Sequence, residues 1–231
     1  MSGSPTRHDG LPPPGRPPAR LLPVLLLLIL PVAAAGTAPD PATGRWRAAD
    51  GPDTASLLEL TPDGRFRYIL AEGALDERAE GRWVRDDGIV RLFTEPAPTP
   101  PRIVAEALRP AAADAPLTVR VSGPGGQGIA GVEFRITFDQ GPPVEGYTQY
   151  DGWTGDAADR RSPRQIRLHE PVYGIMSETV AVPPGVRQLR FRLEPNDLGI
   201  AAFRGTEVLV EGRRLTLRGR LGERHYARVG D

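Results

Sequence analysis

The chain has 231 residues, with 29 Arg plus Lys balanced by 29 Asp plus Glu, and it contains 27 Gly, 26 Pro and no Cys. The balanced charge argues against a nucleic-acid-binding protein, which carries a basic excess. The lack of Cys excludes disulfides, zinc–thiolate sites and cysteine nucleophiles. Every cation is Arg and the single Asn is Asn196, a bias typical of a GC-rich bacterial genome. We therefore interpret the many Arg residues as codon usage before any anion-binding role.

The N-terminal segment has the pattern of a secretory signal. Arg residues precede an apolar run from Leu21 to Val32, and Ala33-Ala34-Ala35 follows it. This order predicts a signal peptide at residues 1–35, cleaved after Ala35. The alternative is a retained membrane anchor, but the run is shorter than the ~20 residues that a spanning helix needs. No later stretch is long or apolar enough to span a membrane, so we expect an exported protein, periplasmic or extracellular.

The section from Gly44 to Thr94 has the pattern of an antiparallel all-β structure. Short alternating apolar stretches are interrupted about every 8 to 12 residues by Gly, Pro or Asp-Gly. Asp63-Gly64 and Asp87-Gly88 predict tight hairpins, because Gly adopts the positive φ that such turns need. The predicted strands are Arg45–Ala48, Leu57–Thr61, Arg65–Ala71, Glu77–Val84 and Ile89–Thr94.

A proline-rich connection follows these strands. Residues Glu95–Pro101 cannot form a central strand, because Pro lacks the amide donor that a ladder needs. Residues Arg102–Arg109 are compatible with one more short strand or a single helical turn, and Pro110–Pro116 has the composition of a second linker. We therefore expect a domain boundary at this second linker.

The next section, residues 116–195, predicts a β-sandwich. Leu117–Val121 and Val132–Phe138 alternate apolar and polar residues, and a Gly-rich turn separates them. About seven short strands in roughly 80 residues suit a sandwich. The other predicted strands are Tyr147–Trp153, Gln165–His169, Glu178–Val182 and Gln188–Leu193.

Three motifs of this section resemble a known family. They are Ile129-Ala130-Gly131-Val132, the stretch Thr148–Gly152, and the closing Leu189-x-Phe191-x-Leu193-x-Pro195. In this order they are similar to the transthyretin-like or carboxypeptidase-regulatory-like β-sandwich. The second motif departs from the family's Thr-Asp-x-x-Gly turn, because Asp151-Gly152 follows Thr148 by three residues. The resemblance implies a stalk, spacer or binding platform.

The first section carries a fainter resemblance. The spacing of three motifs is similar to that in the opening meander of small lipocalin-like β-domains of bacterial envelope proteins. These motifs are Gly44-x-Trp46, Phe66-x-Tyr68 and Gly81-x-Trp83. Such domains end in strands with Leu-x-Leu and Tyr-x-Arg. The C-terminus offers Glu207–Val210, Leu215–Leu217 and His225–Arg228 for these strands.

The two resemblances suggest a domain order. We expect residues 44–109 and 196–231 to complete one lipocalin-like meander or barrel, with the sandwich of residues 116–195 inserted between them. The alternative is two sequential domains, the second of which carries extra C-terminal strands. In both cases the fold class is all-β.

Few residues indicate catalysis or metal binding. His169 and His225 are far apart and lack metal-ligand spacing, so no metal site and no cofactor are predicted. No Ser lies in a nucleophile motif. The enzyme alternative is a hydrolase that uses carboxylates such as Asp151, Asp156 and Glu170 for acid–base chemistry. These side chains are more typical of a solvated loop, and we predict no catalytic residue.

Three aromatic residues suggest a binding surface. Tyr147, Tyr150 and Trp153 fall within one short window, and exposed aromatic side chains stack on sugars or anchor partner proteins. Against this, Tyr147 and Trp153 are six residues apart and would share a strand face, a spacing that also suits core residues. Both interpretations remain open.

A group of cations lies nearby, at Arg160, Arg161, Arg164 and Arg167. Forked guanidinium groups bind carboxylates and phosphates, so the group suggests a site for an acidic glycan or a phosphate. Acidic residues are interspersed with these cations, as in many solvated loops, which is the alternative interpretation.

Four aromatic residues of the first section alternate along predicted strands, namely Trp46, Phe66, Tyr68 and Trp83. They are expected to form a core, or else to line a cavity for a small apolar ligand if the section is a barrel. The sequence thus predicts an exported, non-enzymatic binding or scaffolding protein of the bacterial cell envelope, with a protein or glycan partner. The alternatives are a small apolar-ligand carrier of lipocalin type and the hydrolase.

Overall fold

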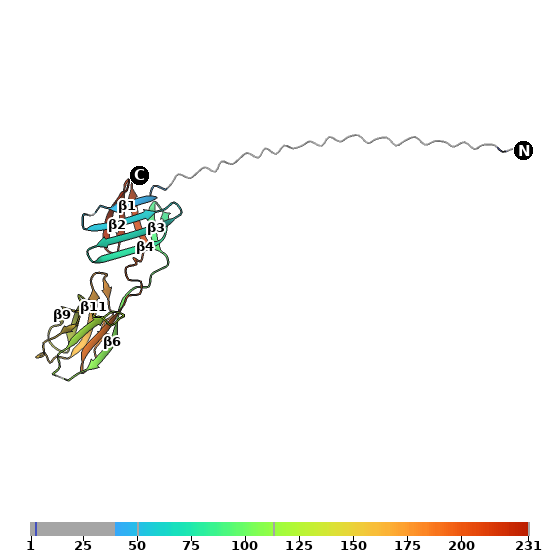
Figure 1. The fold of residues 1–231 in the computed structure, drawn as a ribbon. Helices are drawn as coiled ribbons and strands as arrows, with labels where there is room; N and C mark the ends of the chain where they lie inside the picture. Colours follow the sequence, from blue (N-terminus) through green and yellow to red (C-terminus); the bar gives the residue numbers. More distant parts are fainter. Residues whose placement is uncertain (1–2, 4–39, 50, 113, 231) are drawn as a thin grey trace. The chain divides into compact units, whose positions relative to one another are not determined.

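The structure is a computed structural model that describes residues 3, 40–49, 51–112 and 114–230. The predicted signal peptide, apart from residue 3, lies outside the described residues. All regular elements of the described part are β-strands (Figure 1). Within this part, no helix has the length and apolarity needed to cross a membrane. The all-β prediction is confirmed.

Eight antiparallel strands form a closed barrel, compatible with a lipocalin-like barrel. Closure occurs at β1, whose Trp46 lies opposite Leu58 of β2 on one side and Arg228 of β17 on the other. Around the barrel, the strands follow the order β1 (Gly44–Ala48), β17 (Gly222–Arg228), β16 (Arg214–Gly219), β15 (Arg204–Glu211), β5 (Ile89–Thr94), β4 (Leu75–Asp86), β3 (Arg65–Glu72) and β2 (Thr54–Leu60).

Both hairpins predicted at Asp-Gly are present. Gly64 has a φ of 79° between β2 and β3. Between β4 and β5, Asp87 and Gly88 have φ values of 47° and 82°. Two successive positive φ values are those of the tight turn whose twist matches the strands that it joins.

Two further sheets contain all the described strands between β5 and β15. In the first sheet β14 pairs parallel with β7 and antiparallel with β6, and β10 pairs with β7. The first sheet holds β6 (Arg102–Pro110), β7 (Thr118–Ser122), β10 (Trp153–Thr154) and β14 (Val186–Glu194). The second holds β8 (Glu133–Phe138), β9 (Val144–Tyr147), β11 (Pro163–Glu170), β12 (Ile175–Met176) and β13 (Val180–Ala181).

Two sequence-based predictions differ from the structure. Residues 102–109 were assigned to the barrel section, but β6 pairs with β14 along its length and so belongs to the sandwich sheets. The strand predicted for Tyr147–Trp153 is interrupted, because Gln149 and Gly152 bridge each other in a turn where Gly152 has a φ of 103°. Tyr147 and Trp153 therefore lie on different strands and in different sheets.

The barrel and the sandwich sheets each have a hydrophobic core. The barrel core includes Trp46, Leu58, Phe66 and Tyr226, all at most 1% exposed. The core between the sandwich sheets includes Ile136, Leu168 and Phe191. The side chain of Tyr173 packs against both cores.

Two neighbouring segments connect the barrel with the sandwich sheets. Where the chain leaves and re-enters the barrel, the amide of Thr94 donates to the carbonyl of Phe203 at 2.9 Å. Farther along, the amide of Thr99 donates to the carboxylate of Asp197 at 2.8 Å. Asn196, at a φ of 43°, donates from its side chain to the carbonyl of Pro100 at 2.8 Å. The outgoing and returning segments are thus hydrogen-bonded to each other.

Candidate functional site

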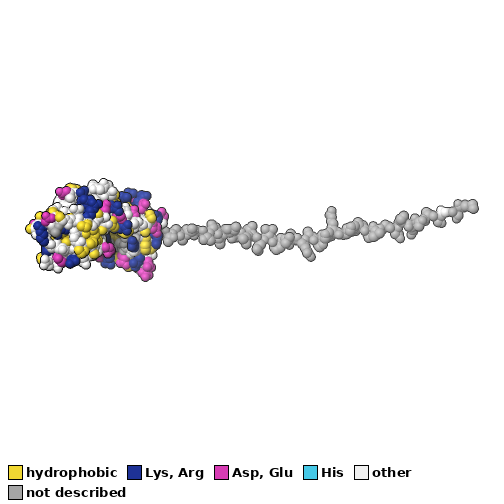
Figure 2. Space-filling model, turned by 90° about the horizontal axis from the view of Figure 1, so that it is seen from below, with side chains coloured by type: hydrophobic (Ala, Val, Ile, Leu, Met, Phe, Trp, Pro, Cys, Tyr) yellow, Lys and Arg dark blue, Asp and Glu magenta, His cyan; other side chains and the backbone are white. Residues whose placement is uncertain are grey.

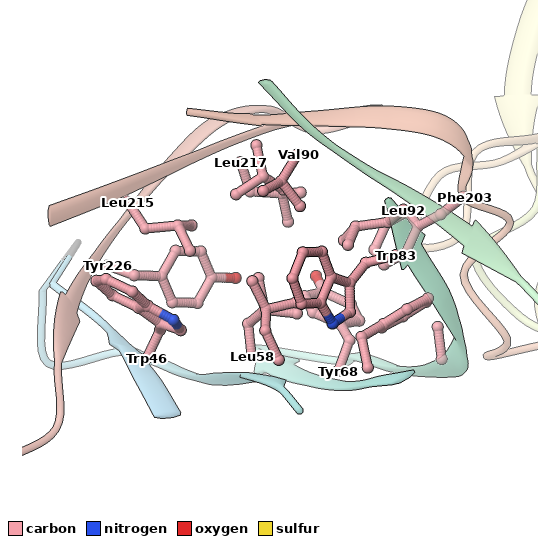
Figure 3. Close-up of a cluster of buried hydrophobic side chains, with 14 of the residues drawn as sticks. Trp46, Leu58, Tyr68, Trp83, Val90, Leu92, Phe203, Leu215, Leu217 and Tyr226 are labelled. Carbon is pink, nitrogen blue, oxygen red and sulfur yellow. The ribbon is translucent and has the colours of Figure 1, made fainter. Parts of the chain in front are cut away.

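The four aromatic residues considered as cavity lining lie in the barrel core (Figure 3). Trp46, Phe66, Tyr68 and Trp83 are 0%, 1%, 4% and 8% exposed. Both indoles are hydrogen-bonded to the backbone, Trp46 to the carbonyl of Ala42 at 2.9 Å and Trp83 to that of Thr61 at 3.0 Å. Figure 3 shows Trp46, Tyr68 and Trp83 in the barrel interior together with labelled leucines such as Leu215 and Leu217. They belong to the core of the barrel, as the core interpretation expects.

A small polar group lies within this apolar interior. The hydroxyl of Ser56 donates to the carbonyl of Ile69 at 2.7 Å and lies 2.9 Å from the hydroxyl of Tyr226. Burial is the main cause that raises the pKa of Tyr68 well above its usual value. Tyr68 is therefore protonated at neutral pH.

A pocket of about 330 Å³ lies at one end of the barrel, and Tyr68 of the barrel core is one of its lining residues. Its walls are largely apolar, with Phe203 packed edge-on against Tyr68 at 5.0 Å between ring centroids. Leu217 lies in the same wall, and the loop that carries Tyr173 lines the pocket from the sandwich. The mouth of a β-barrel is a usual place for a small-molecule site.

Charged groups lie on one side of this barrel-end pocket. Arg220 forms an ion pair with Glu77 at 2.5 Å, and the side chain of Glu77 is only 10% exposed. Arg224 forms an ion pair with Glu72 at 2.7 Å. Each of these two cations has an anion beside it, and Arg204 and Asp197 also line the pocket. The pocket thus combines apolar walls with hydrogen-bonding groups that favour a neutral ligand over an ion.

The predicted aromatic group divides into two environments. Tyr147 and Tyr150 are 59% and 76% exposed. Trp153 is half-buried and packs edge-on against Phe134 at 4.9 Å between ring centroids. Only the two tyrosines are therefore placed on an open surface, whereas Trp153 takes part in sandwich packing.

The predicted Arg group does not converge on one point. Arg160, Arg164 and Arg167 are exposed, and Arg167 lies opposite Arg135 across β11 and β8. Arg161 is held by Asp159 through two pairs of atoms, Nε to Oδ1 at 3.0 Å and Nη2 to Oδ2 at 2.7 Å. Figure 2 likewise shows cationic and anionic side chains interspersed on one face rather than separated by sign.

Sequence reasoning missed Arg187, the second residue of β14. Its side chain is buried, with 6% exposure, and it lines a pocket at the end of the sandwich together with Trp153 and Arg161. Val186 and Arg187 are both buried, because a bulge between Val186 and Gln188 breaks the alternation of the strand. Counted back from Leu189 by the two-residue period of a strand, Arg187 falls on the same face as Phe191 and Leu193, so the pattern did carry a signal for its burial.

The carboxylates of the hydrolase alternative lie far apart along β11. Asp156 lines the pocket near the start of this strand, whereas Glu170 is its last residue. Both oxygens of Glu170 accept backbone amides, from Val172 at 3.1 Å and Tyr173 at 2.9 Å. Across the described residues, no group of three or more His, Cys, Asp or Glu side chains is placed to hold a metal ion.

Comparisons with protein-family models, with curated proteins and with solved structures found no match. The function is therefore inferred from the geometry of the pockets and exposed residues described above.

Proposed function

We propose that the protein is an exported, non-enzymatic binding protein of the bacterial cell envelope that takes up a small, mainly apolar molecule at the end of its barrel. The observation that carries the proposal is the barrel-end pocket, in which Tyr68, Phe203 and Leu217 meet the ion pair between the largely buried Glu77 and the exposed Arg220. The signal sequence pattern supports export.

The shape of the pocket sets the size of the ligand. Aromatic and aliphatic side chains fill the barrel, so the ligand is proposed to lie at the end of the barrel and not inside it. A volume of about 330 Å³ is at the lower end of the range for small-molecule sites, about 300–1,000 Å³. Burial of apolar ligand surface there contributes roughly 25 cal/mol per Å². A compact molecule with few polar groups therefore suits this pocket.

The charged side of the pocket sets the orientation of the ligand. The guanidinium of Arg220 has five N–H donors, and its ion pair with Glu77 leaves donors for a ligand carbonyl or hydroxyl. An anion would compete with Glu77, and a cation would be repelled by Arg220. We therefore expect a neutral molecule with one hydrogen-bonding end.

The test uses a neutral apolar dye, N-phenyl-1-naphthylamine, whose fluorescence increases in apolar surroundings. Ala202 is exposed and lines the pocket, so Ala202→Phe fills the space without disturbing the core. Ala71 is exposed on β3 outside the pocket, and Ala71→Phe is the matched control. We expect Ala202→Phe to weaken dye binding about tenfold and Ala71→Phe to leave it unchanged. Equal binding by both variants would exclude the barrel end as the site.

Exposed tyrosines of the sandwich favour a second candidate function, contact with a protein or glycan. Tyr147 and Tyr150 are the most exposed aromatic side chains of the described residues. The resemblance to transthyretin-like modules supports a platform of this kind. Co-sedimentation with insoluble cell-wall polysaccharide, compared between the native chain and Tyr147→Ser/Tyr150→Ser, tests it. Retention that does not change in the double variant would exclude these residues.

A further inference from the structure

A second pocket, of about 470 Å³, lies in the sandwich, away from the barrel-end pocket. It is found at the end of the sandwich where β6 stops and β14 begins, and the connections to the barrel are at the opposite ends of these two strands. Phe138, Trp153 and Leu117 form its apolar part. Asp159, Arg161 and Arg187 form its charged part.

Arg187 has an unusual environment for a buried cation. Its Nε donates to the carbonyl of Ala115 at 2.5 Å and its Nη2 to that of Asp159 at 2.7 Å. Its Nη1 donates to the carbonyl of Arg161 at 3.3 Å. A guanidinium has five N–H donors, so these three hydrogen bonds leave donors for another acceptor. In the described part of the chain, no carboxylate forms an ion pair with Arg187.

Asp159 interacts electrostatically with Arg187, but this single carboxylate is shared with Arg161. Asp159 is engaged through both carboxylate oxygens by Arg161. The hydrogen bond from Arg161 is the main cause that holds the pKa of Asp159 below its usual value, so this pair persists at neutral pH. Asp156 is exposed at the pocket, and its carboxylate accepts the amide of Ala158 at 2.8 Å. The buried part of the pocket thus has one excess positive charge.

The apolar part offers a flat surface beside this charge. The guanidinium of Arg161 lies over the ring of Phe138 at 4.2 Å from its centroid. Trp153 packs edge-on against Phe134, and its indole also lines the pocket. A buried cation without a counter-ion is costly, and a ligand anion that reaches Arg187 would offset this cost.

We propose that this sandwich pocket is a second binding site, for a small molecule that has both a ring and a carboxylate. The carboxylate accepts N–H donors of Arg187, and the ring packs against Trp153 and Phe138. Aromatic acids and uronic acids share this chemistry. The site is independent of the barrel-end pocket in both position and preferred ligand charge.

Isothermal titration of the full chain with phenylacetate and with glucuronate tests the proposal. Phenylacetamide, which has the same ring without the charge, is the matched ligand control. We expect saturable binding of one of the two acids, and at least about tenfold weaker binding of the amide, because hydrogen bonds to a charged partner are strong. The acid that binds identifies the class. Binding of neither acid, or equal binding of phenylacetate and phenylacetamide, would overturn the proposal.

Two variants locate the binding. Asp156→Asn removes an exposed anion at the pocket and is expected to tighten acid binding about twofold to fivefold, whereas Arg164→Gln, exposed on β11 outside the pocket, should have no effect. Arg187→Lys keeps the positive charge but removes the planar guanidinium that donates two parallel hydrogen bonds to a carboxylate. This variant should bind the acid more weakly. If Arg187→Lys does not fold, the acid affinity of Asp156→Asn alone tests the location of the site. Acid affinity that is identical in Asp156→Asn and the native chain would place the ligand elsewhere. Dye binding at the barrel end is the separate readout for the other pocket.

Discussion

Gly81 lies in β4, where the backbone of the adjacent strand leaves no room for a side chain. A Cβ at this position would lie 2.0 Å from the carbonyl oxygen of Phe93 and 2.8 Å from the amide nitrogen of Glu95. We expect Gly81→Ala to lower the free energy of unfolding of the barrel by about 2–4 kcal/mol, because backbone must move to relieve the overlap. Urea denaturation followed by tryptophan fluorescence measures the loss.

Gly219 provides the matched control for this substitution. It lies in β16 of the same barrel, and a Cβ there would meet no atom within 4 Å. We expect Gly219→Ala to change the urea midpoint little, within about 0.5 kcal/mol. Similar losses in the two variants would mean that the close approach of the neighbouring backbone at Gly81 does not cause the loss of stability in Gly81→Ala.

The polar pair inside the barrel gives a second prediction for single residues. Tyr226→Phe removes the hydroxyl that lies 2.9 Å from Ser56, and Ser56→Ala removes the other partner. Each change is expected to cost about 1–2 kcal/mol. The double variant should cost less than the sum, by about 0.5–1.5 kcal/mol. Additive losses in a double-mutant cycle would show that the two hydroxyls do not interact.

At the level of elements, an ion pair fixes the start of the described barrel chain to the β4–β5 hairpin. Arg85 of β4 contacts both carboxylate oxygens of Asp40, at 2.7 and 2.8 Å. The hydrogen bond from Arg85 is the main cause that lowers the pKa of Asp40 below 3.8. A lowered pKa in the folded state means that this stabilisation is present above the unfolded-state pKa and is lost as the pH falls through the folded-state pKa.

Substitution Arg85→Gln should therefore alter the pH dependence of stability. At pH 7 we expect a loss of about 0.5–1 kcal/mol, since the pair is partly exposed. As the pH falls through the folded-state pKa of Asp40, the variant and the native chain should become equal, because Asp40 is then protonated in both. Thermal melts across this pH range measure the difference. A gap that persists at low pH would assign the effect to the hydrogen bond from Arg85 to Gly88 instead.

Sequence patterns located all eight barrel strands and gave the bounds of three of them within one residue. The observed β5 has the predicted bounds, and β1 and β3 differ from the prediction by one residue. The short strands were harder to predict. β12 has two residues and depends on pairing with the end of β11, which no local pattern reveals. Trp153 and Arg161 are candidate site residues in the sequence, but the pocket that they share also includes Arg187, which was missed although the strand period places it on the core face.

At the scale of the whole molecule, the barrel strands come from two separate stretches of chain. β5 and β15 are neighbours, with Phe93 opposite Arg204, so the points where the chain leaves and re-enters the barrel are close in space. The sandwich strands β6 and β14 likewise bring Arg102 opposite Glu194, and the two side chains form an ion pair at 2.6 Å. Each set of strands thus has adjacent ends, as an inserted domain does.

This arrangement predicts that the two parts fold separately. Replacement of residues 97–199 by a short Gly-Ser linker should leave a folded barrel, and residues 101–196 alone should fold as a sandwich. Circular dichroism and cooperative thermal unfolding of the two fragments check this expectation. A fragment that lacks a cooperative transition would show that it depends on the other, through contacts such as those of Tyr173.

Pairing of β1 with β17 also governs the order in which the molecule can form. The strands β1–β5 are made first, yet the edges of this partial sheet gain their partners only after β15–β17 have been synthesised. Until then, two rows of unpaired backbone groups are open to other chains. A ribosome that stalls within the sandwich region would release an incomplete sheet prone to association. Cells that make this protein therefore have reason to keep the chain extended until its last strands are available.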